Sequence, residues 1–596
     1  MRKMFNIKYI IIVCLTFAAF LPVELNAQQK IDPTLEVMRD FDAYLLEVQK
    51  SKIKPIFPDS ISKFNLNFDY SIFDKPLDNL YEFSPLPSAK IDYERVTNYP
   101  LLWTNLGVNF PFNPHIDLVL QPKLPSNFLF ALYGGYNSFL GKVDRIGVEN
   151  GKAVRTDNKI YSPEYNGNLG LKFNYSYKKG EIGLKLQFDK AMYSFYGGCD
   201  SSSQDFTSYK KTFLKDTLSH SFNRFGTHIY LKSTNERPNY FYYELNLKYS
   251  YIDDKVKYLE ILHQSDNNNT KYSFNENYMN VNATLGPVFA EFHRFLVGID
   301  YKASNSVTSS TLDRYYVEAF PRYVFNQNRW IFEVGLKLGK YVDDFGDDFD
   351  FFPKGSLSYE LARKRVWLYA SLDGHSDFYS YSRLMDINPW ITPSIDIQKS
   401  STPWIVQGGI RGKIIDKISF NLWMGFTDYN KYLSLFHYTD SITGVINTFQ
   451  AKYYDMQKIS AGGELLWKSD AVTAGINIKY NDYENDDKTP VYNLPSFDAL
   501  IFGRYSWRER IIASLSINHR SKFETTEFNK LQETTSPDTI ITIPSTTFVN
   551  LDATYVFNKN LSFYLKLNNL LNANDFSYIY YGNTGFGVGF GIALKI

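Results

Sequence analysis

The side chains of this chain alternate between apolar and polar with a period of two, and this pattern constrains the fold more than any other feature. In 561–568, for example, one face carries only Leu and Phe, and the other carries Ser562, Tyr564, Lys566 and Asn568. The same alternation occurs at 169–178, 182–189, 241–250, 295–302, 330–339, 418–427, 472–481, 511–518 and 548–557. Successive side chains of a β-strand point to opposite faces. The sequence therefore predicts an all-β protein whose strands each have one apolar and one polar face.

A soluble sandwich and a membrane barrel both produce this alternation, and three observations favour the barrel. Many runs reach the roughly 9–11 residues that a tilted membrane strand needs, whereas a globular strand averages about 5–6. Their polar faces carry Lys, Glu, Asn and Gly, which suit a wet lumen. Aromatic residues make up 17% of the chain, and pairs such as Tyr175/Tyr177 and Tyr249/Tyr251 lie near strand ends, as in interfacial girdles.

The connections between the runs alternate in length, which is typical of an outer-membrane barrel. Short polar turns occur at 178–180, 326–328, 362–364, 416–417, 468–470, 507–509 and 558–560. Longer polar segments lie between them at 196–219, 376–400, 484–490, 522–545 and 572–584. The last run, 585–596, has an apolar face and a Gly-rich face, and is expected to pair with the first strand to close the barrel. We expect a transmembrane antiparallel β-barrel over 126–596, with roughly 18 strands in a range of about 16–20.

Residues 1–27 read as a signal peptide. A basic start with Arg2, Lys3 and Lys8 precedes an apolar stretch over 9–20, which is too short to span a bilayer, and cleavage is expected after Ala27. Export followed by barrel insertion predicts the outer membrane of a Gram-negative bacterium. Cleavage leaves Cys199 as the only thiol, so no internal disulfide is expected; its role is left open.

Residues 28–125 lack the alternation. Positions 34–50 have the apolar spacing of a helix, and the remainder is rich in Pro, Asp and aromatic residues. We interpret this region as a periplasmic helix followed by an extended segment, with a poorly ordered linker as the alternative. Residues 28–100 are also the part through which other outer-membrane or periplasmic proteins are expected to bind.

Motifs near the C-terminus resemble those of a known family. A strand begins at Val491-Tyr492-Asn493-Leu494-Pro495 and ends at Arg504-Tyr505-Ser506-Trp507, and Asn568-Asn569-Leu570-Leu571-Asn572 precedes the Gly-rich final strand. Their order and spacing over about 490–596 resemble the C-terminal barrel of TonB-dependent receptors, especially outer-membrane proteins of the Bacteroidetes type. The resemblance implies an outer-membrane barrel.

The chain also departs from that family. Receptors of the family carry a plug domain before the barrel, and no plug-like pattern or TonB-contacting box is visible in 28–125. The family's barrel has about 22 strands, for which this chain is expected to be too short. The chain ends at Ile596, where the family commonly ends in an aromatic residue. We therefore expect a barrel without a plug, and the resemblance does not carry energised import with it.

Few residues suggest chemistry. The formal charge is +1, which argues against a nucleic-acid partner, and no two of the eight His residues have metal-ligand spacing. Asp373, His375, Ser376 and Asp377 fit a polar strand end better than a catalytic group, so we expect no enzyme and no cofactor. Asp343, Asp344, Asp347 and Asp348 are weak candidates for a cation site beside the simpler alternative of a solvated loop. The polar faces supply the candidate lumen-facing residues: Lys172, Lys185, Glu244, Lys248, Glu333, Lys337, Arg411, Lys413 and Lys479.

Two functions remain open from the sequence. The first is a passive or partner-gated outer-membrane channel for small solutes. The second is a non-transporting structural subunit of an outer-membrane protein assembly or secretion complex, with the N-terminal segment or a partner filling the lumen. A barrel enzyme is a weaker third reading.

Overall fold

The computed structural model describes most of the chain after residue 99. The described residues are 100–195, 219–234, 239–256, 273–307, 311–327, 329–344, 346–392, 395–439, 448–485, 491–529, 539–574, 576, 578–582 and 584–596. The expected signal peptide, the helix expected over 34–50 and Cys199 all lie outside these residues.

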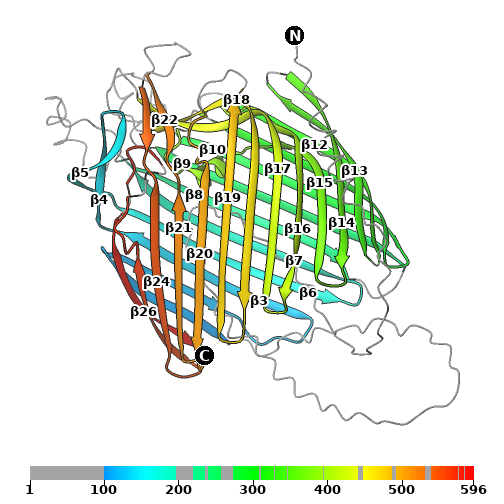
Figure 1. The fold of residues 1–596 in the computed structure, drawn as a ribbon, viewed down its shortest axis with the longest axis horizontal. Coiled ribbons are helices and arrows are strands. Elements are labelled where there is room, and N and C mark those ends of the chain that lie inside the picture. Colours follow the sequence, from blue (N-terminus) through cyan, green and yellow to red (C-terminus); the bar gives the residue numbers. More distant parts are fainter. Residues whose placement is uncertain are drawn as a thin grey trace. The chain divides into compact units, whose positions relative to one another are not determined.

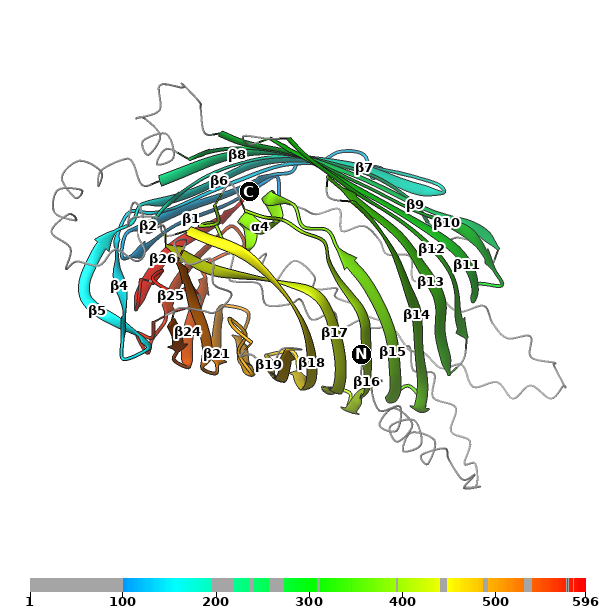
Figure 2. The same ribbon diagram turned by 90° about the horizontal axis from the view of Figure 1, so that it is seen from above.

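The described residues form one 26-stranded sheet that closes on itself (Figures 1 and 2). Neighbouring strands of the ring pair antiparallel, and the ring closes where β1 pairs with β26, from Trp103 opposite Lys595 to Phe110 opposite Val588. Closure satisfies the backbone groups that an open edge would expose. The first half of the ring consists of β1 Leu102–Phe110, β2 Asn113–Leu120, β3 Phe128–Phe139, β6 Glu164–Tyr177, β7 Gly180–Ser194, β8 Ser219–Ser233, β9 Tyr240–Val256, β10 Ser273–Phe289, β11 His293–Val307, β12 Thr311–Gln327 and β13 Trp330–Asp343. The second half consists of β14 Gly346–Ala362, β15 Val366–Asp377, β16 Ser400–Ile415, β17 Ile418–Thr439, β18 Thr448–Lys468, β19 Val472–Asn485, β20 Phe497–Trp507, β21 Ile511–Arg520, β24 Thr546–Val556, β25 Leu561–Asn568 and β26 Gly587–Lys595.

The ring has 22 strands, so the expectation of roughly 18, in a range of about 16–20, was wrong, and so was the expectation that the chain is too short for about 22. The ring begins at Leu102, ahead of the barrel boundary expected at residue 126. Its first two strands, β1 and β2, lie in the region that was interpreted as an extended segment. Short turns of two or three residues leave enough chain for the remaining strands. Some strands are much longer than the ring needs. β17, for example, has 22 residues and extends beyond the ring at the long-loop end as one strand.

The four strands outside the ring form two hairpins. They are β4 Lys142–Glu149 with β5 Lys152–Tyr161, and β22 Phe523–Asn529 with β23 Thr539–Ile543. β22 pairs in parallel with the end of β17, and β23 meets β5 through Thr542 and Lys152. The hairpins therefore join connections that lie far apart in the sequence.

The two ends of the ring differ, as the sequence predicts, but the separation of short from long connections is incomplete. Only two or three residues join β1 to β2, β11 to β12 and β13 to β14, and these strand ends lie at the end that also carries the long connections. One end, the short-turn end, carries tight connections such as 178–179 and 363–365, and the two chain ends of the ring meet there through hydrogen bonds between Leu102 and Ile596. The opposite end, the long-loop end, carries the extended connections and the β4–β5 and β22–β23 hairpins (Figure 1).

Glycine on the inner face of β26 is explained by the seam it forms. A Cβ atom at Gly591 would lie 2.3 Å from the Leu106 carbonyl oxygen and 2.3 Å from the Tyr564 hydroxyl, and one at Gly589 would overlap Asn109. The side chains of Asn109 on β1 and Tyr564 on β25 thus lie against β26, and His115 hydrogen-bonds Tyr564 at 2.8 Å.

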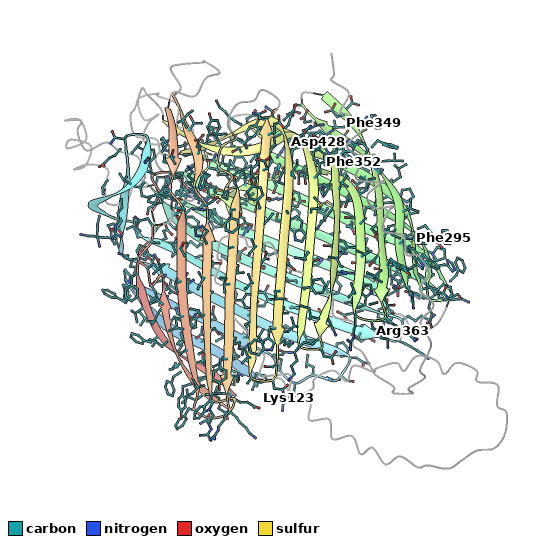
Figure 3. The ribbon with its side chains drawn as sticks, viewed as in Figure 1. Lys123, Phe295, Phe349, Phe352, Arg363 and Asp428 are labelled. Carbon is teal, nitrogen blue, oxygen red and sulfur yellow. The ribbon has the colours of Figure 1, made fainter. Side chains whose placement is uncertain are left out.

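The apolar faces of the strands point away from the ring. Phe295, Leu422 and Met424 are exposed by 51%, 53% and 66%, and Phe295 and Phe349 project outward in Figure 3. The large buried apolar cluster lies instead at the long-loop end, between connections and the upper parts of the strands. No helix within the described residues is long and apolar enough to cross a membrane.

Candidate functional site: the lumen and the segment that crosses it

The connection between β15 and β16, residues 378–399, runs inside the ring; we call it the inner segment (Figure 2). It contains the one helix of the described residues, α4 Tyr381–Ile387. Ser380 caps this helix by accepting a hydrogen bond from the backbone N–H of Arg383 at 3.1 Å. Tyr381 and Leu384 are fully buried. The strands that contact α4, such as β8, β9 and β10, are distant around the ring from β15 and β16, between which the inner segment runs.

A buried ionic group holds the start of α4 against β10 and β12. The Glu276 carboxylate accepts the backbone N–H groups of Tyr381 and Ser382, each at 2.9 Å, and the Ser304 hydroxyl at 2.8 Å. Arg314 lies 3.8 Å from Glu276 and donates to the Tyr379 carbonyl oxygen at 2.9 Å. A buried charge is costly unless it is paired and hydrogen-bonded, so these contacts define one position for the segment.

Further polar contacts extend this attachment to β8 and β9. The Tyr381 hydroxyl donates to Asp254 at 2.6 Å, and His220 lies 3.2 Å from the same carboxylate. Arg224 on β8 bridges Asp189 of the wall and Asp386 of α4, at 3.1 Å each. Tyr379, also on the inner segment, is mostly buried, and this burial is the largest cause that raises its pKa above the ordinary value.

The far part of the inner segment contacts β7, the last connection and β18. The Trp390 ring stacks on Tyr581 of the last connection at 3.9 Å and its indole N–H donates to the Ser194 carbonyl oxygen at 3.1 Å. Its carbonyl oxygen accepts the Phe449 N–H of β18 at 3.0 Å. The inner segment therefore crosses the lumen at the long-loop end and joins walls that are distant around the ring.

Two of the predicted lumen residues, Glu333 and Lys337, are in ion pairs below this crossing. Lys337 and Lys354 both contact Asp373, at 2.8 and 2.6 Å, and Glu333 lies 3.6 Å from Arg322. These groups come from β12–β15 and share the inner face.

The other predicted lumen residues have looser surroundings. Glu244 accepts hydrogen bonds from Tyr242 and Asn246. Lys172 stands opposite Lys185 in the β6–β7 register, and Lys185 lies over the Tyr133 ring at 5.7 Å. The remaining pairings on the inner face are Lys248 opposite His228, Lys413 opposite Ser419, Lys479 opposite Asp498, and Arg411 over the Tyr369 ring. The nine residues do not converge on one point, and their role in selectivity stays a prediction.

Sequence reasoning missed a second feature of the lumen, which is flat aromatic side chains over glycine. A Cβ atom at Gly170, Gly183 or Gly409 would lie 2.2–2.7 Å from the rings of Tyr133, Tyr230 and Tyr369 on adjacent strands. Trp423 lies in the same way over Gly462, and Phe502 over Gly475. Glycine at inward positions of long strands was the available signal, since an aromatic neighbour can rescue it. The wall is thus smooth and aromatic between its charged groups.

The structure places the weak cation-site candidates on the β13–β14 hairpin. Asp347 pairs with Lys340 at 2.8 Å, and Asp348 lies 3.7 Å from Lys399. Within the part of the chain that is described, no group of three or more His, Cys, Asp or Glu side chains is arranged to hold a metal ion. His375 lies 3.6 Å from Asp377 and is adjacent to the inner segment.

The fold defines a class, that of large closed antiparallel β-barrels. No family model and no curated protein matches the sequence. Among solved structures, the FrpB iron transporter from Neisseria meningitidis (F3-3 variant) matches with a TM-score of 0.64 at 9% identity, over 84% of this chain and 82% of that one. The siderophore receptor PirA from Acinetobacter baumannii matches with a TM-score of 0.63 at 11% identity, over 84% and 81%. A mutant ferric enterobactin receptor PfeA from Pseudomonas aeruginosa matches at 0.60 and 13%, over 83% and 80%. At these identities the likeness shows a shared fold.

Proposed function

We propose that this chain is an outer-membrane barrel of the TonB-dependent-receptor type, without a plug domain, that conducts small solutes through its lumen. The observation that carries the proposal is the closed 22-stranded ring with apolar residues outside and charged residues inside. A barrel of this size encloses a lumen that must be blocked if it is not to conduct. The structural neighbours include transporters of iron, which supports transport as the general role.

We further propose that the inner segment is the gate of this channel. It crosses the lumen at the long-loop end and is held there by Glu276, Arg314, Asp254 and Arg224. These contacts are polar, so a solute or a partner that competes for the same hydrogen-bonding groups can release the segment without rebuilding the barrel wall. A partner is proposed to bind through residues 28–100.

Single-channel recording in planar bilayers tests both parts. The full chain is compared with a variant in which residues 381–390 are replaced by a Gly/Ser linker of equal length, and with a control that carries Glu318→Gln, because Glu318 bonds Tyr316 of the wall and no residue of α4. We expect small or rare openings from the full chain and the control, and larger, persistent openings from the linker variant. Silence of all three in folded, inserted barrels would contradict transport.

The alternative, a structural subunit of an outer-membrane assembly, is favoured by one observation. The β22–β23 hairpin pairs with β17 and contacts β5. Connections of the long-loop end are therefore joined by strand pairing into one continuous surface to which a partner can bind. Crosslinking in intact cells followed by mass spectrometry should then recover a stoichiometric partner. Recovery of the barrel alone, together with conductance, would support the channel.

A further inference from the structure

The short-turn end carries an excess of exposed basic residues, which we call the basic rim. Its densest parts are Lys178-Lys179, Arg363-Lys364-Arg365 and Arg508-Glu509-Arg510, in turns that are widely separated around the ring. Figure 3 places Lys123 and Arg363 at this end. The acidic residues of the described short turns are fewer: Glu291, Asp416, Asp470 and Glu509. The rim therefore presents positive charge on several sides of the barrel.

Tryptophan stands directly beside the basic rim in three places. The sequence pairs are Arg329-Trp330, Trp467-Lys468 and Trp507-Arg508, at the short-turn ends of β13, β18 and β20. The three indole rings are 46%, 45% and 46% exposed, on the outward face of their strands. The Arg508 guanidinium also lies over the Trp507 ring at 5.2 Å.

This arrangement matches the depth profile of a bilayer surface. Tryptophan favours the headgroup level, where its ring is half in the apolar region, and a cation one residue farther from the apolar band reaches the phosphate layer. The long-loop end differs, because the outward Phe349 and Phe351 have Asp347, Asp348 and Asp350 as sequence neighbours. The charge beside the outward aromatic residues is thus positive at the short-turn end and negative on the β14 strand end. This difference indicates that the two ends of the barrel meet lipid headgroups of different charge.

We propose that the basic rim binds the phosphates of anionic phospholipid headgroups in the leaflet that meets the short-turn end. This inference rests on the proposed membrane location, but not on conduction. A phosphate group accepts hydrogen bonds from guanidinium and ammonium groups such as those of the rim, and its negative charge is complementary to their positive charge on several sides of the ring. The bound lipids would fix the depth of the barrel at the Trp residues.

Native mass spectrometry of the full chain, titrated with dioleoyl phosphatidylglycerol or zwitterionic dioleoyl phosphatidylcholine, tests the proposal. The rim variant carries Arg363→Gln, Arg365→Gln, Arg508→Gln and Arg510→Gln. The matched control carries four neutralisations in the lumen, away from the turns: Lys172→Gln, Lys185→Gln, Lys248→Gln and Lys479→Gln. Each near-surface cation contributes roughly a five-fold preference for anionic lipid. We expect the apparent affinity of the rim variant for phosphatidylglycerol to fall at least about 10-fold, with phosphatidylcholine binding unchanged and the control like wild type.

Two results would overturn the proposal. Equal phosphatidylglycerol binding by wild type and the rim variant would show that the rim does not bind this headgroup. An equal loss in the lumen control would show that only net charge matters. Flotation of the wild-type chain with neutral vesicles separates these outcomes from failure of the membrane location, and bilayer recording separates them from failure of transport.

Discussion

Glu276 and Asp373 are carboxylates of the same inner wall with different surroundings. Glu276 is 1% exposed and accepts two backbone N–H groups of α4, whereas Asp373 lies below the crossing between two lysines. The sequence predicted lumen-facing charges such as Lys337 from the alternation alone. It did not predict Glu276 as an anchor, because its partners Tyr381 and Ser382 lie more than a hundred residues away and no local pattern links them.

Replacing Glu276 by Gln should release the start of α4. A hydrogen bond to a charged group contributes about 1.5–3 kcal/mol, so we expect the amides of residues 380–386 to exchange with solvent roughly 10- to 100-fold faster. Hydrogen–deuterium exchange measures this, with Glu318→Gln as the control that leaves the helix untouched. Unchanged exchange in 380–386 would show that the apolar contacts of Leu384 and Trp390 hold the segment without Glu276.

Replacing Asp373 by Asn should shift the ion selectivity of the lumen toward anions. The change leaves Lys337 and Lys354 without the carboxylate that both contact, in a wall where charge acts on permeating ions. The reversal potential in a salt gradient measures the shift. Asp470→Asn removes the same charge from a turn outside the lumen, and an equal shift in that variant would contradict a local effect.

At the scale of strands, the alternation predicted the long strands whose apolar face points outward. It did not predict strands whose inner face is also apolar or made of glycine. In β1 the inward Trp103 is buried, and Gly107 stands opposite a histidine, so the strand shows no clear alternation. The upper part of β17 contacts protein on both sides at the long-loop end, and its sequence is mixed for the same reason. From the sequence, Gly589 and Gly591 predicted only that some group approaches the inner face of the last strand. Asn109 and Tyr564 could be named as those groups only once the pairing of β26 with β1 and β25 was known.

The seam between β1 and β26 should be sensitive to a single methyl group. In Gly591→Ala the added Cβ would meet the Leu106 carbonyl oxygen, which is backbone and must move with its strand. Overpacking of this kind costs about 1–3 kcal/mol, so we expect a lower urea midpoint for unfolding in lipid vesicles. Gly503→Ala, which has nothing within 4 Å of the new Cβ, is the matched control and should unfold like wild type.

At the scale of the whole molecule, the closed ring and the tight connections of the short-turn end were both predicted from the sequence, although three short connections also lie at the long-loop end. The strand count was not, because it depends on where the first strand begins and on which hairpins stay outside the ring. The crossing of the lumen was not visible either, since it is assembled from contacts between the inner segment and at least four distant strands. The sequence therefore predicts the wall of the barrel better than its contents.

The central claim is that the apolar face of the ring contacts lipid and the polar face contacts water. Single-cysteine variants along β19, at Val472, Ala474, Ile476 and Ile478 on one face and Thr473, Asn477 and Lys479 on the other, test it most directly in a Cys199→Ser background. Each variant, reconstituted in vesicles, is labelled with a thiol-reactive fluorophore and exposed to quenchers in the lipid or in the water. We predict quenching that alternates with a period of two, by lipid at the first set and by water at the second. Equal access from water on both faces, or no lipid quenching at the first set, would contradict the account.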